Sequence, residues 1–134
     1  MDFLDWENEL IETDRLIQNT VRALITKEIQ PLIQDSFRSE QFPLQIPRIL
    51  GTLGILGPTI PFEGRETVGA LAYGLMMREL ERCDSGLRSF ASVQGSLVMF
   101  PIYQFGSEEQ KNVWLPKLAR GESIGCFGLT EVEG

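Results

Sequence analysis

The most informative residues for the fold lie at the end of the sequence and read Ile124-Gly125-Cys126-Phe127-Gly128-Leu129-Thr130, followed by Glu131-Val132-Glu133-Gly134. Their side chains alternate in character as those of a β-strand do, whereas the other patterns in the chain are helical. Successive side chains of a strand point to opposite faces, which here places on one face Ile124, Cys126, Gly128 and Thr130. A single strand needs a neighbour for its backbone donors and acceptors. We therefore expect a helical domain over residues 1–121, and over residues 122–134 the first strand of a second domain whose remainder lies elsewhere.

The residues before this stretch have the apolar spacing of helices. Apolar side chains recur at three- and four-residue steps from near Glu12 to about Phe37, which predicts one long helix. Pro31 should break or kink it, because proline removes an amide donor and crowds the preceding turn. Further helices are expected at Leu44–Leu53, Val68–Cys83 and Leu87–Phe105, and from residue 108 to near Ala119.

Capping residues predict where several of these helices begin. Ser107–Gln110 reads as a capping box, a serine followed three residues later by glutamine. Thr67 is expected to cap the helix that follows it, and Asp84–Gly86 forms a turn that can cap the next one. Within the Val68–Cys83 helix, Gly69 and Gly74 weaken helix propensity, so we interpret them as points of close helix approach.

The charge and composition of the 134-residue chain exclude several classes of function. Twelve basic against nineteen acidic residues give a net charge of −7, which argues against nucleic acid or an anionic membrane surface as a partner. No stretch reaches the roughly 20 apolar residues of a membrane span. The chain contains no histidine, so Ser-His-Asp, Cys-His and histidine-based metal sites are impossible within it.

The cysteines and the acidic N-terminus indicate the compartment. Cys83 and Cys126 are the only cysteines, and we interpret them as reduced, small apolar side chains. The first residues are acidic, whereas a secretory or organellar leader would be basic. We expect a soluble protein in the cytoplasm, or in the mitochondrial matrix if the source is eukaryotic.

Two stretches together resemble one enzyme family. They are Arg78-Glu79-Leu80-Glu81-Arg82-Cys83-Asp84-Ser85-Gly86-Leu87-Arg88-Ser89 and Phe127-Gly128-Leu129-Thr130-Glu131. With them the chain resembles the acyl-CoA dehydrogenases, and within that family it is most similar to glutaryl-CoA dehydrogenases. The resemblance runs from about Trp6 to the C-terminus. It implies an all-α N-terminal helical domain, a kinked but continuing helix at Pro31, and a last segment that is the first strand of a middle β-domain.

Arg88 and Ser89 are the candidate substrate-binding residues. From the pattern alone they are an exposed basic and a small polar side chain in the first turn of a helix. The resemblance implies that they bind the free carboxylate at the far end of the acyl chain. A planar guanidinium suits that task, because it can donate two parallel hydrogen bonds to a carboxylate.

Phe127, Leu129 and Thr130 are the candidate cofactor-binding residues. Periodicity alone makes them part of a buried strand with a hydroxyl at its exit. The resemblance implies that they contact FAD, since the same run begins the family's flavin loop. Val132 departs from the family, which usually has proline at that position.

Two further groups of residues have a structural and a functional interpretation. The resemblance implies that one helix face lines or backs the acyl pocket, whereas pattern alone makes it plain core: Phe90, Val93, Gln94, Leu97, Val98 and Met99. Glu79 and Glu81 resemble paired carboxylates, but with the neighbouring arginines they fit a solvated helix face with local ion pairs.

The resemblance also implies a reaction. In the family a glutamate of the C-terminal domain, expected beyond residue 134, removes the α-proton of the thioester while hydride passes from the β-carbon to FAD. The glutaryl branch then loses CO₂ to give crotonyl-CoA in amino acid catabolism, as a homotetramer that passes electrons to an electron-transfer flavoprotein. The alternatives are a dehydrogenase for a neutral acyl-CoA and a non-catalytic helical interaction module. The 134 residues alone are expected to be inactive.

Overall fold

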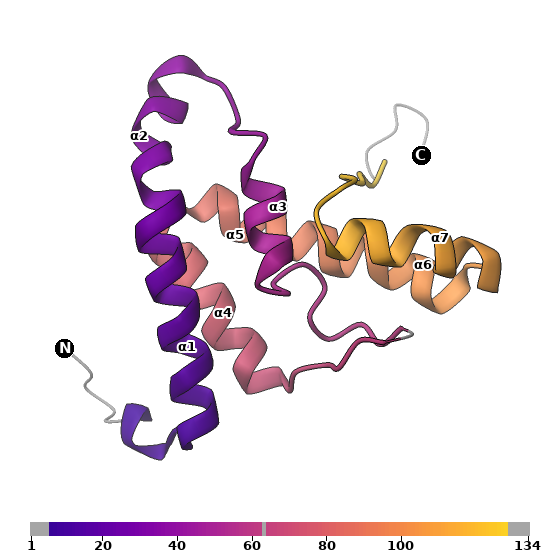
Figure 1. Cartoon of the computed structure of the whole chain (residues 1–134), viewed down its shortest axis with the longest axis horizontal. Helices are drawn as coiled ribbons and strands as arrows, with labels where there is room; N and C mark the ends of the chain where they lie inside the picture. Colours follow the sequence, from indigo (N-terminus) through magenta and orange to yellow (C-terminus); the bar gives the residue numbers. More distant parts are fainter. Residues whose placement is uncertain (1–5, 63, 129–134) are drawn as a thin grey trace.

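A long N-terminal rod forms one side of the computed structural model, which describes residues 6–62 and 64–128 (Figure 1). The short 3-10 helix η1 (Trp6–Glu9) precedes it. The rod consists of α1 (Glu12–Leu24), the π-helical segment η2 (Ile25–Ile29) and α2 (Gln30–Ser39), which follow one another without a break. The helix therefore continues through Pro31, as expected.

Each of the two long helical runs contains a π-helical segment just before a proline. Pro31 follows η2, and Pro101 follows the second such segment, η3 (Val93–Met99). In both, the residue before the proline donates its amide to the carbonyl five residues back, Gln30 to Ile25 and Phe100 to Gly95. Because proline lacks an amide hydrogen and its ring crowds the preceding turn, the wider π turn lets the helix run past it.

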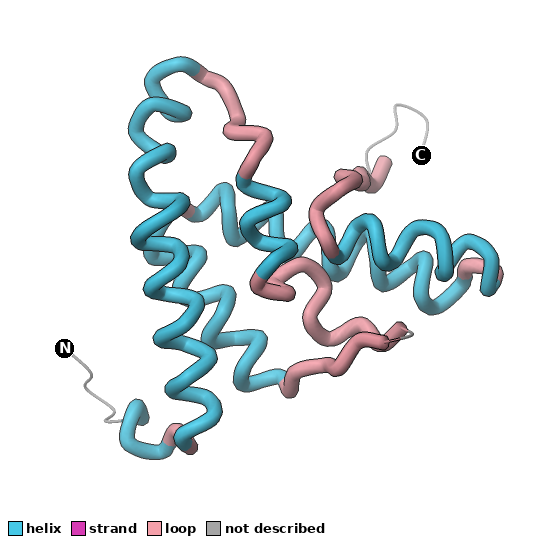
Figure 2. Tube along the Cα trace, in the orientation of Figure 1, coloured by secondary structure: helices cyan, strands magenta, loops and turns pink. Residues whose placement is uncertain are grey.

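The remaining helices pack beside this rod. They are α3 (Ile46–Thr52), α4 (Ala70–Cys83), α5 (Ser85–Ser92), η3, α6 (Phe100–Phe105) and α7 (Glu108–Ala119). α4 packs along α1 and against α5, and α7 returns beside α6 as a hairpin (Figure 1). Long loops join α2 to α3 and α3 to α4 (Figure 2). Over residues 6–62 and 64–128 the fold has helices but no strand, in agreement with the expected all-α class.

The last described segment, residues 122–128, leaves α7, and the described part of the chain offers it no strand to pair with. It was predicted as a β-strand from its alternation. Residues 124–128 are irregular here and do not form a strand, and the assignment of residues 122–134 to a second domain stays a prediction. The remainder of the predicted strand, Leu129 and Thr130, lies outside the described residues.

Local capping was predicted correctly at two helices. The Gln110 amide donates to Ser107 Oγ at 3.2 Å, and the Ser107 amide donates to Gln110 Oε1 at 2.8 Å. This reciprocal pair is the expected capping box. Asp84 caps α5, since its Oδ1 accepts a hydrogen bond from the Leu87 amide at 3.0 Å.

The start of α4 and the role of two glycines were predicted wrongly. Gly69 and not Thr67 is the N-cap, because the Val68 amide donates to the Pro58 carbonyl at 3.0 Å and thereby belongs to the preceding loop. A Cβ added at Gly69 or Gly74 would meet nothing within 4 Å, so neither is a close approach. Close approaches occur instead at other glycines, among them Gly51 against Arg120, Gly121 against Pro47 and Gly125 against Val98.

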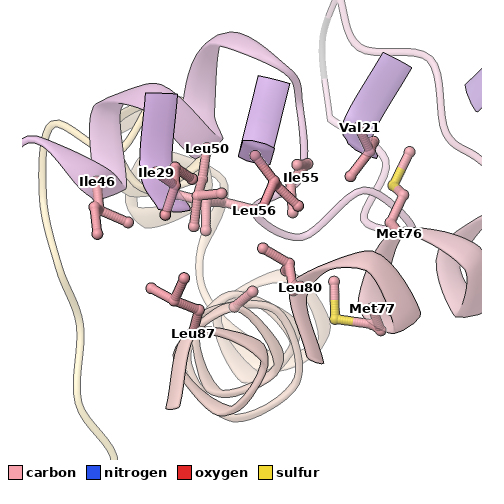
Figure 3. Close-up of a cluster of buried hydrophobic side chains, with 12 residues drawn as sticks. Val21, Ile29, Ile46, Leu50, Ile55, Leu56, Met76, Met77, Leu80 and Leu87 are labelled. Atoms are coloured by element: carbon pink, nitrogen blue, oxygen red, sulfur yellow. The ribbon is translucent and has the colours of Figure 1, made fainter. Parts of the chain in front are cut away.

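One apolar core joins the rod to the helices behind it. Side chains from α1, η2, α3 and α4 converge there with Leu87 of α5 (Figure 3). Its fully buried members include Ile25, Ile29, Ile46, Leu50, Ile55, Leu56 and Leu80. A second, smaller cluster lies between η3 and α7 and contains Ile60, Val98, Met99, Leu115, Leu118 and Ala119. Burial of this kind stabilises by about 25 cal/mol for each Å² of apolar surface.

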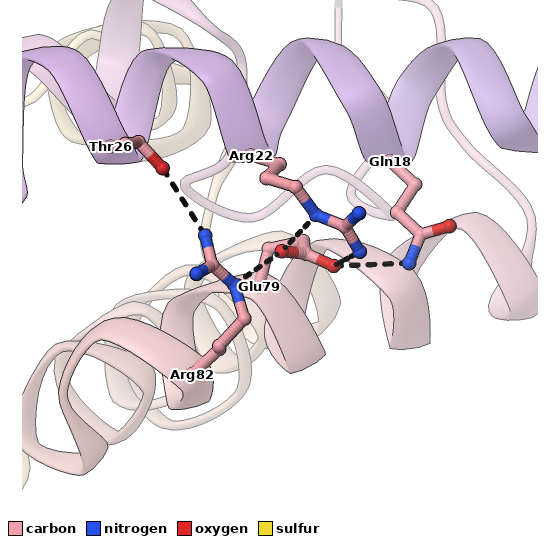
Figure 4. A network of polar contacts seen from close by, with 5 residues as sticks. All are labelled: Gln18, Arg22, Thr26, Glu79 and Arg82. Atoms are coloured by element: carbon pink, nitrogen blue, oxygen red, sulfur yellow. Dashed lines mark hydrogen bonds and ion pairs between the residues drawn. The ribbon is translucent and has the colours of Figure 1, made fainter. Parts of the chain in front are cut away.

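A buried carboxylate connects α1 to α4 (Figure 4). The side chain of Glu79 is 1% exposed and accepts hydrogen bonds from Arg22 at 2.8 and 2.9 Å, Gln18 at 3.0 Å and Arg82 at 3.0 Å. Burial alone would raise the pKa of Glu79, but the bonds from Arg22, Gln18 and Arg82 outweigh it and lower the pKa to about 2. The prediction of a solvated helix face is therefore wrong for Glu79.

Residues 6–62 and 64–128 contain neither a membrane-spanning helix nor a cluster of metal ligands. No helix there combines the length and the apolar character needed to cross a membrane. In the same part of the chain, no three or more cysteine, aspartate and glutamate side chains gather as metal ligands would.

Candidate functional site

An open pocket of about 640 Å³ lies where α2, α5 and η3 meet the last described segment. The loop between α2 and α3 closes another side. Most of the wall is apolar, with Ser36, Asp84, Ser89 and Gln94 as its polar members. The other lining residues are Ile33, Phe37, Phe42, Pro43, Ile46, Gly86, Leu87, Phe90, Val93, Leu97, Ile124, Gly125, Cys126 and Phe127. A concave apolar site with few polar groups is typical of small-molecule binding.

The first turn of α5 is held in place from both ends. Asp84 has extended backbone dihedrals and its carboxylate caps the turn at Leu87. Leu87 is 2% exposed and belongs to the main core. These two anchors orient the following residues, so that Ser89 and Phe90 lie in the pocket wall, where the Phe90 ring packs 5.4 Å from that of Phe42.

The structure separates the two predicted substrate-binding residues. Ser89 lies in the wall of the pocket. Arg88 does not line it, because its Nε donates to Glu81 Oε2 at 2.7 Å in a half-exposed ion pair. None of the described residues that line the pocket is an arginine or a lysine. In this arrangement the described wall of the pocket therefore offers no cation to a bound carboxylate.

Of the predicted cofactor-binding residues, the structure describes one. Phe127 is 46% exposed and contributes to the pocket wall together with Ile124 and Cys126. Beside it, Gly128 faces open space, since a Cβ there would meet nothing within 4 Å. Leu129 and Thr130 lie outside the described residues.

The expected pocket-lining helix face divides between the pocket and the second core cluster. Phe90, Val93, Gln94 and Leu97 line the pocket, whereas Val98 and Met99 are buried in the second cluster. Sequence reasoning missed one feature: the Gln94 side chain is buried and holds the backbone of Gly125. A glutamine on an otherwise apolar helix face was the available signal.

The comparisons with known proteins agree on one family. The family model for the acyl-CoA dehydrogenase N-terminal domain matches residues 11–122. The human mitochondrial short-chain specific acyl-CoA dehydrogenase is 36% identical over 124 residues, which are 92% of this chain and 30% of that enzyme.

Two solved structures are similar to nearly the whole of this chain. A Mycobacterium smegmatis glutaryl-CoA dehydrogenase in complex with FADH2 is 46% identical with a TM-score of 0.92, over 99% of this chain and 34% of that one. A structure described as the electron transferring flavoprotein of Acidaminococcus fermentans is 32% identical with a TM-score of 0.82, over 98% of this chain and 34% of that one. This chain thus spans about a third of the length of these proteins. By the family-model match over residues 11–122, the chain belongs to the acyl-CoA dehydrogenase family.

Proposed function

We propose that this chain is the N-terminal part of an FAD-dependent acyl-CoA dehydrogenase that acts on glutaryl-CoA. The observation that carries the proposal is the apolar pocket between α2, α5 and residues 124–127, with Ser89 in its wall. The 46% identity to the Mycobacterium smegmatis glutaryl-CoA dehydrogenase supports the choice of substrate. Because the chain spans only about a third of its relatives, the activity belongs to a longer protein that contains it.

The described residues fit one edge of a flavin site. Phe127 presents a half-exposed ring in the pocket wall, and an aromatic face can pack on a flat ring system. The open space at Gly128 leaves room beside it. We propose that Phe127, Leu129 and Thr130 hold this edge of FAD. The flavin, when bound, supplies the acceptor for the hydride that leaves the substrate.

The residues of this chain bind and orient the acyl group. The apolar wall removes water from the acyl chain, which is favourable in proportion to the apolar area buried. Arg88 and Ser89 bind the terminal carboxylate of a dicarboxylic substrate once Arg88 exchanges Glu81 for the ligand. The glutamate that removes the α-proton is supplied by another part of the protein, and the 134 residues alone are expected to be inactive.

A neutral, short acyl-CoA is the second candidate substrate. Two observations favour it: the ion pair between Arg88 and Glu81 keeps the guanidinium out of the pocket wall, and the human relative is a short-chain specific enzyme. A neutral acyl chain needs no cation in the pocket. The two candidates differ in what they require of Arg88.

The cellular setting is also part of the proposal. We propose a cytoplasmic or mitochondrial-matrix homotetramer, active in amino acid catabolism, that passes electrons to an electron-transfer flavoprotein. The likeness to the structure described as the electron transferring flavoprotein of Acidaminococcus fermentans supports the last of these.

Filling the pocket is expected to weaken substrate binding. Leu97 lines the pocket and is 38% exposed, so Leu97→Trp adds volume there with little cost to the core. The larger ring would occupy volume that the acyl chain needs, so the Kd of an acyl-CoA should rise about tenfold, which corresponds to about 1.4 kcal/mol. Calorimetric titration of the flavin-loaded full-length protein with glutaryl-CoA and butyryl-CoA measures the two Kd values.

Val113→Trp is the matched control for this change. Val113 is 42% exposed on α7 and lies outside the pocket, so the same type of substitution should leave the Kd unchanged. Unaltered binding by Leu97→Trp would show that the acyl chain binds elsewhere.

A further inference from the structure

Gln94 is a buried polar side chain on the helix that lines the pocket. It is 3% exposed and lies in η3, next to the apolar residue Val93. A buried carboxamide without hydrogen-bond partners costs free energy. The groups that Gln94 bonds to therefore indicate its role in the structure.

Its partner is the backbone of one residue in the last described segment. Gln94 Nε2 donates to the Gly125 carbonyl at 2.8 Å, and the Gly125 amide donates to Gln94 Oε1 at 2.9 Å. Two residues that face each other in an antiparallel sheet exchange the same pair of bonds through their own N–H and C=O groups. Gln94 therefore takes the place of a neighbouring strand at this single residue, 31 positions along the chain.

Gly125 is also fixed by close packing on the same helix. A Cβ added there would overlap the Val98 side chain, and Val98 stands four residues after Gln94, one turn along. The segment thus crosses the helix at Gly125 and is held there by two hydrogen bonds and a steric stop. The residues on either side of this crossing, Ile124, Cys126 and Phe127, form one wall of the pocket.

We propose that Gln94 is a positioning residue that sets residues 124–127 against η3, and so fixes both this wall of the pocket and the start of the flavin edge at Phe127. Its effect on the flavin rests on the proposed function. Gln94 acts through the backbone of Gly125. Without it, Gly125 would still pack on Val98 but would have lost the partner of its amide and its carbonyl.

The first test uses hydrogen exchange and needs no flavin. In the full chain, Gln94→Met keeps the length and burial of the side chain and removes both hydrogen bonds. Exchange of the Gly125 amide should become about tenfold faster or more, as expected when a protecting pair of bonds is lost. Gln104→Met, an exposed position on α6, is the matched control and should leave it unchanged. Unchanged exchange in Gln94→Met would overturn the proposal.

Gly125→Ala tests the same geometry by a different route. The added methyl group overlaps Val98 and should displace the segment, which again accelerates exchange at residue 125. Combining it with Val98→Ala removes the overlapping methyl groups and should restore slow exchange, because the nearest remaining atom would be the Cβ of residue 98, at 3.2 Å. Failure of this second change to restore protection would show that the crossing at Gly125 is not what holds the segment.

A third measurement uses the flavin-loaded full-length protein. Gln94→Met should raise the Kd for FAD about tenfold and shift the visible flavin spectrum, while the thermal unfolding midpoint matches that of Gln104→Met. Faster exchange at Gly125 with an unchanged spectrum and Kd would overturn the positioning role. If the unmodified protein bound no FAD, the proposed function would fail, and the exchange data would still decide whether Gln94 holds the pocket wall.

Discussion

Glu79→Gln is expected to lower the free energy of unfolding by about 3 kcal/mol at neutral pH, because removing one partner of a buried ionic network is strongly destabilising. The Glu79 carboxylate accepts bonds from Arg22 and Gln18 of α1 and from Arg82. Glutamine would place an amide N–H₂ group against these donors and would supply no negative charge. Equilibrium denaturation in urea, compared at constant slope, measures the difference.

The lowered pKa of Glu79 also makes the free energy of unfolding depend on pH. The pKa of Glu79 is lowered from its usual 4.5 to about 2 in the folded chain. The charged form is thus favoured by folding, so its contribution is complete above about pH 4.5 and is lost as the pH falls toward about 2. Over this window the unfolding free energy of the unmodified protein should fall more steeply than that of Glu79→Gln.

Glu28→Gln is the matched control for both measurements. Glu28 pairs with Lys27 at 3.1 Å on the surface, with side chains 43% and 82% exposed. Exposed pairs of this kind contribute little, so the change should stay within about 0.5 kcal/mol. A similar small effect in Glu79→Gln, or parallel pH profiles, would contradict a stabilising role for the buried network.

Arg88→Gln is expected to reduce kcat/KM for glutaryl-CoA by about 10²-fold or more in the full-length protein, equivalent to losing roughly 3 kcal/mol of charge-assisted bonding. A terminal carboxylate must lose water on binding, which is costly unless a cation and hydrogen bonds replace that water. Glutamine keeps much of the volume and some donor capacity but removes the charge. Steady-state kinetics with glutaryl-CoA and butyryl-CoA measure the effect, and butyryl-CoA should change far less.

Arg120→Gln separates this effect from a general loss of charge. Arg120 is 58% exposed, pairs with Glu122 and does not line the pocket, so its replacement should leave both substrates unaffected. Equal losses on the two substrates in Arg88→Gln would assign Arg88 a structural role with Glu81. The second candidate, a dehydrogenase for a neutral acyl-CoA, would then be preferred.

The features that could be predicted from the sequence depend on residues close together in the chain. The capping box at Ser107–Gln110 and the cap at Asp84 each link residues three positions apart. The long N-terminal helix follows from the spacing of its own apolar residues. The π turn before Pro31 also has a local cause, because proline has no amide hydrogen to donate.

The features that could not be predicted depend on contacts between distant residues. In the sequence, Glu79 has the pattern of a surface carboxylate. It is buried because α1 packs on α4 and Arg22, 57 positions away, donates hydrogen bonds to it. In the sequence, Gln94 is a polar residue on an otherwise apolar helix face. Its hydrogen-bond partner, Gly125, lies 31 positions later in the chain. Thr67 has the chemistry of a cap, but the bond from Val68 to Pro58 moves the helix start beyond it. In each case tertiary contacts override the local pattern.

Anaerobic mixing of the flavin-loaded full-length protein with glutaryl-CoA tests the central claim most directly. If this chain is part of a glutaryl-CoA dehydrogenase, the visible absorbance of the oxidised flavin should disappear as hydride passes from the substrate, and crotonyl-CoA should be released. Loss of absorbance with butyryl-CoA but not with glutaryl-CoA would contradict the assignment of glutaryl-CoA as the substrate. An unchanged flavin spectrum with both thioesters would contradict acyl-CoA dehydrogenase activity itself.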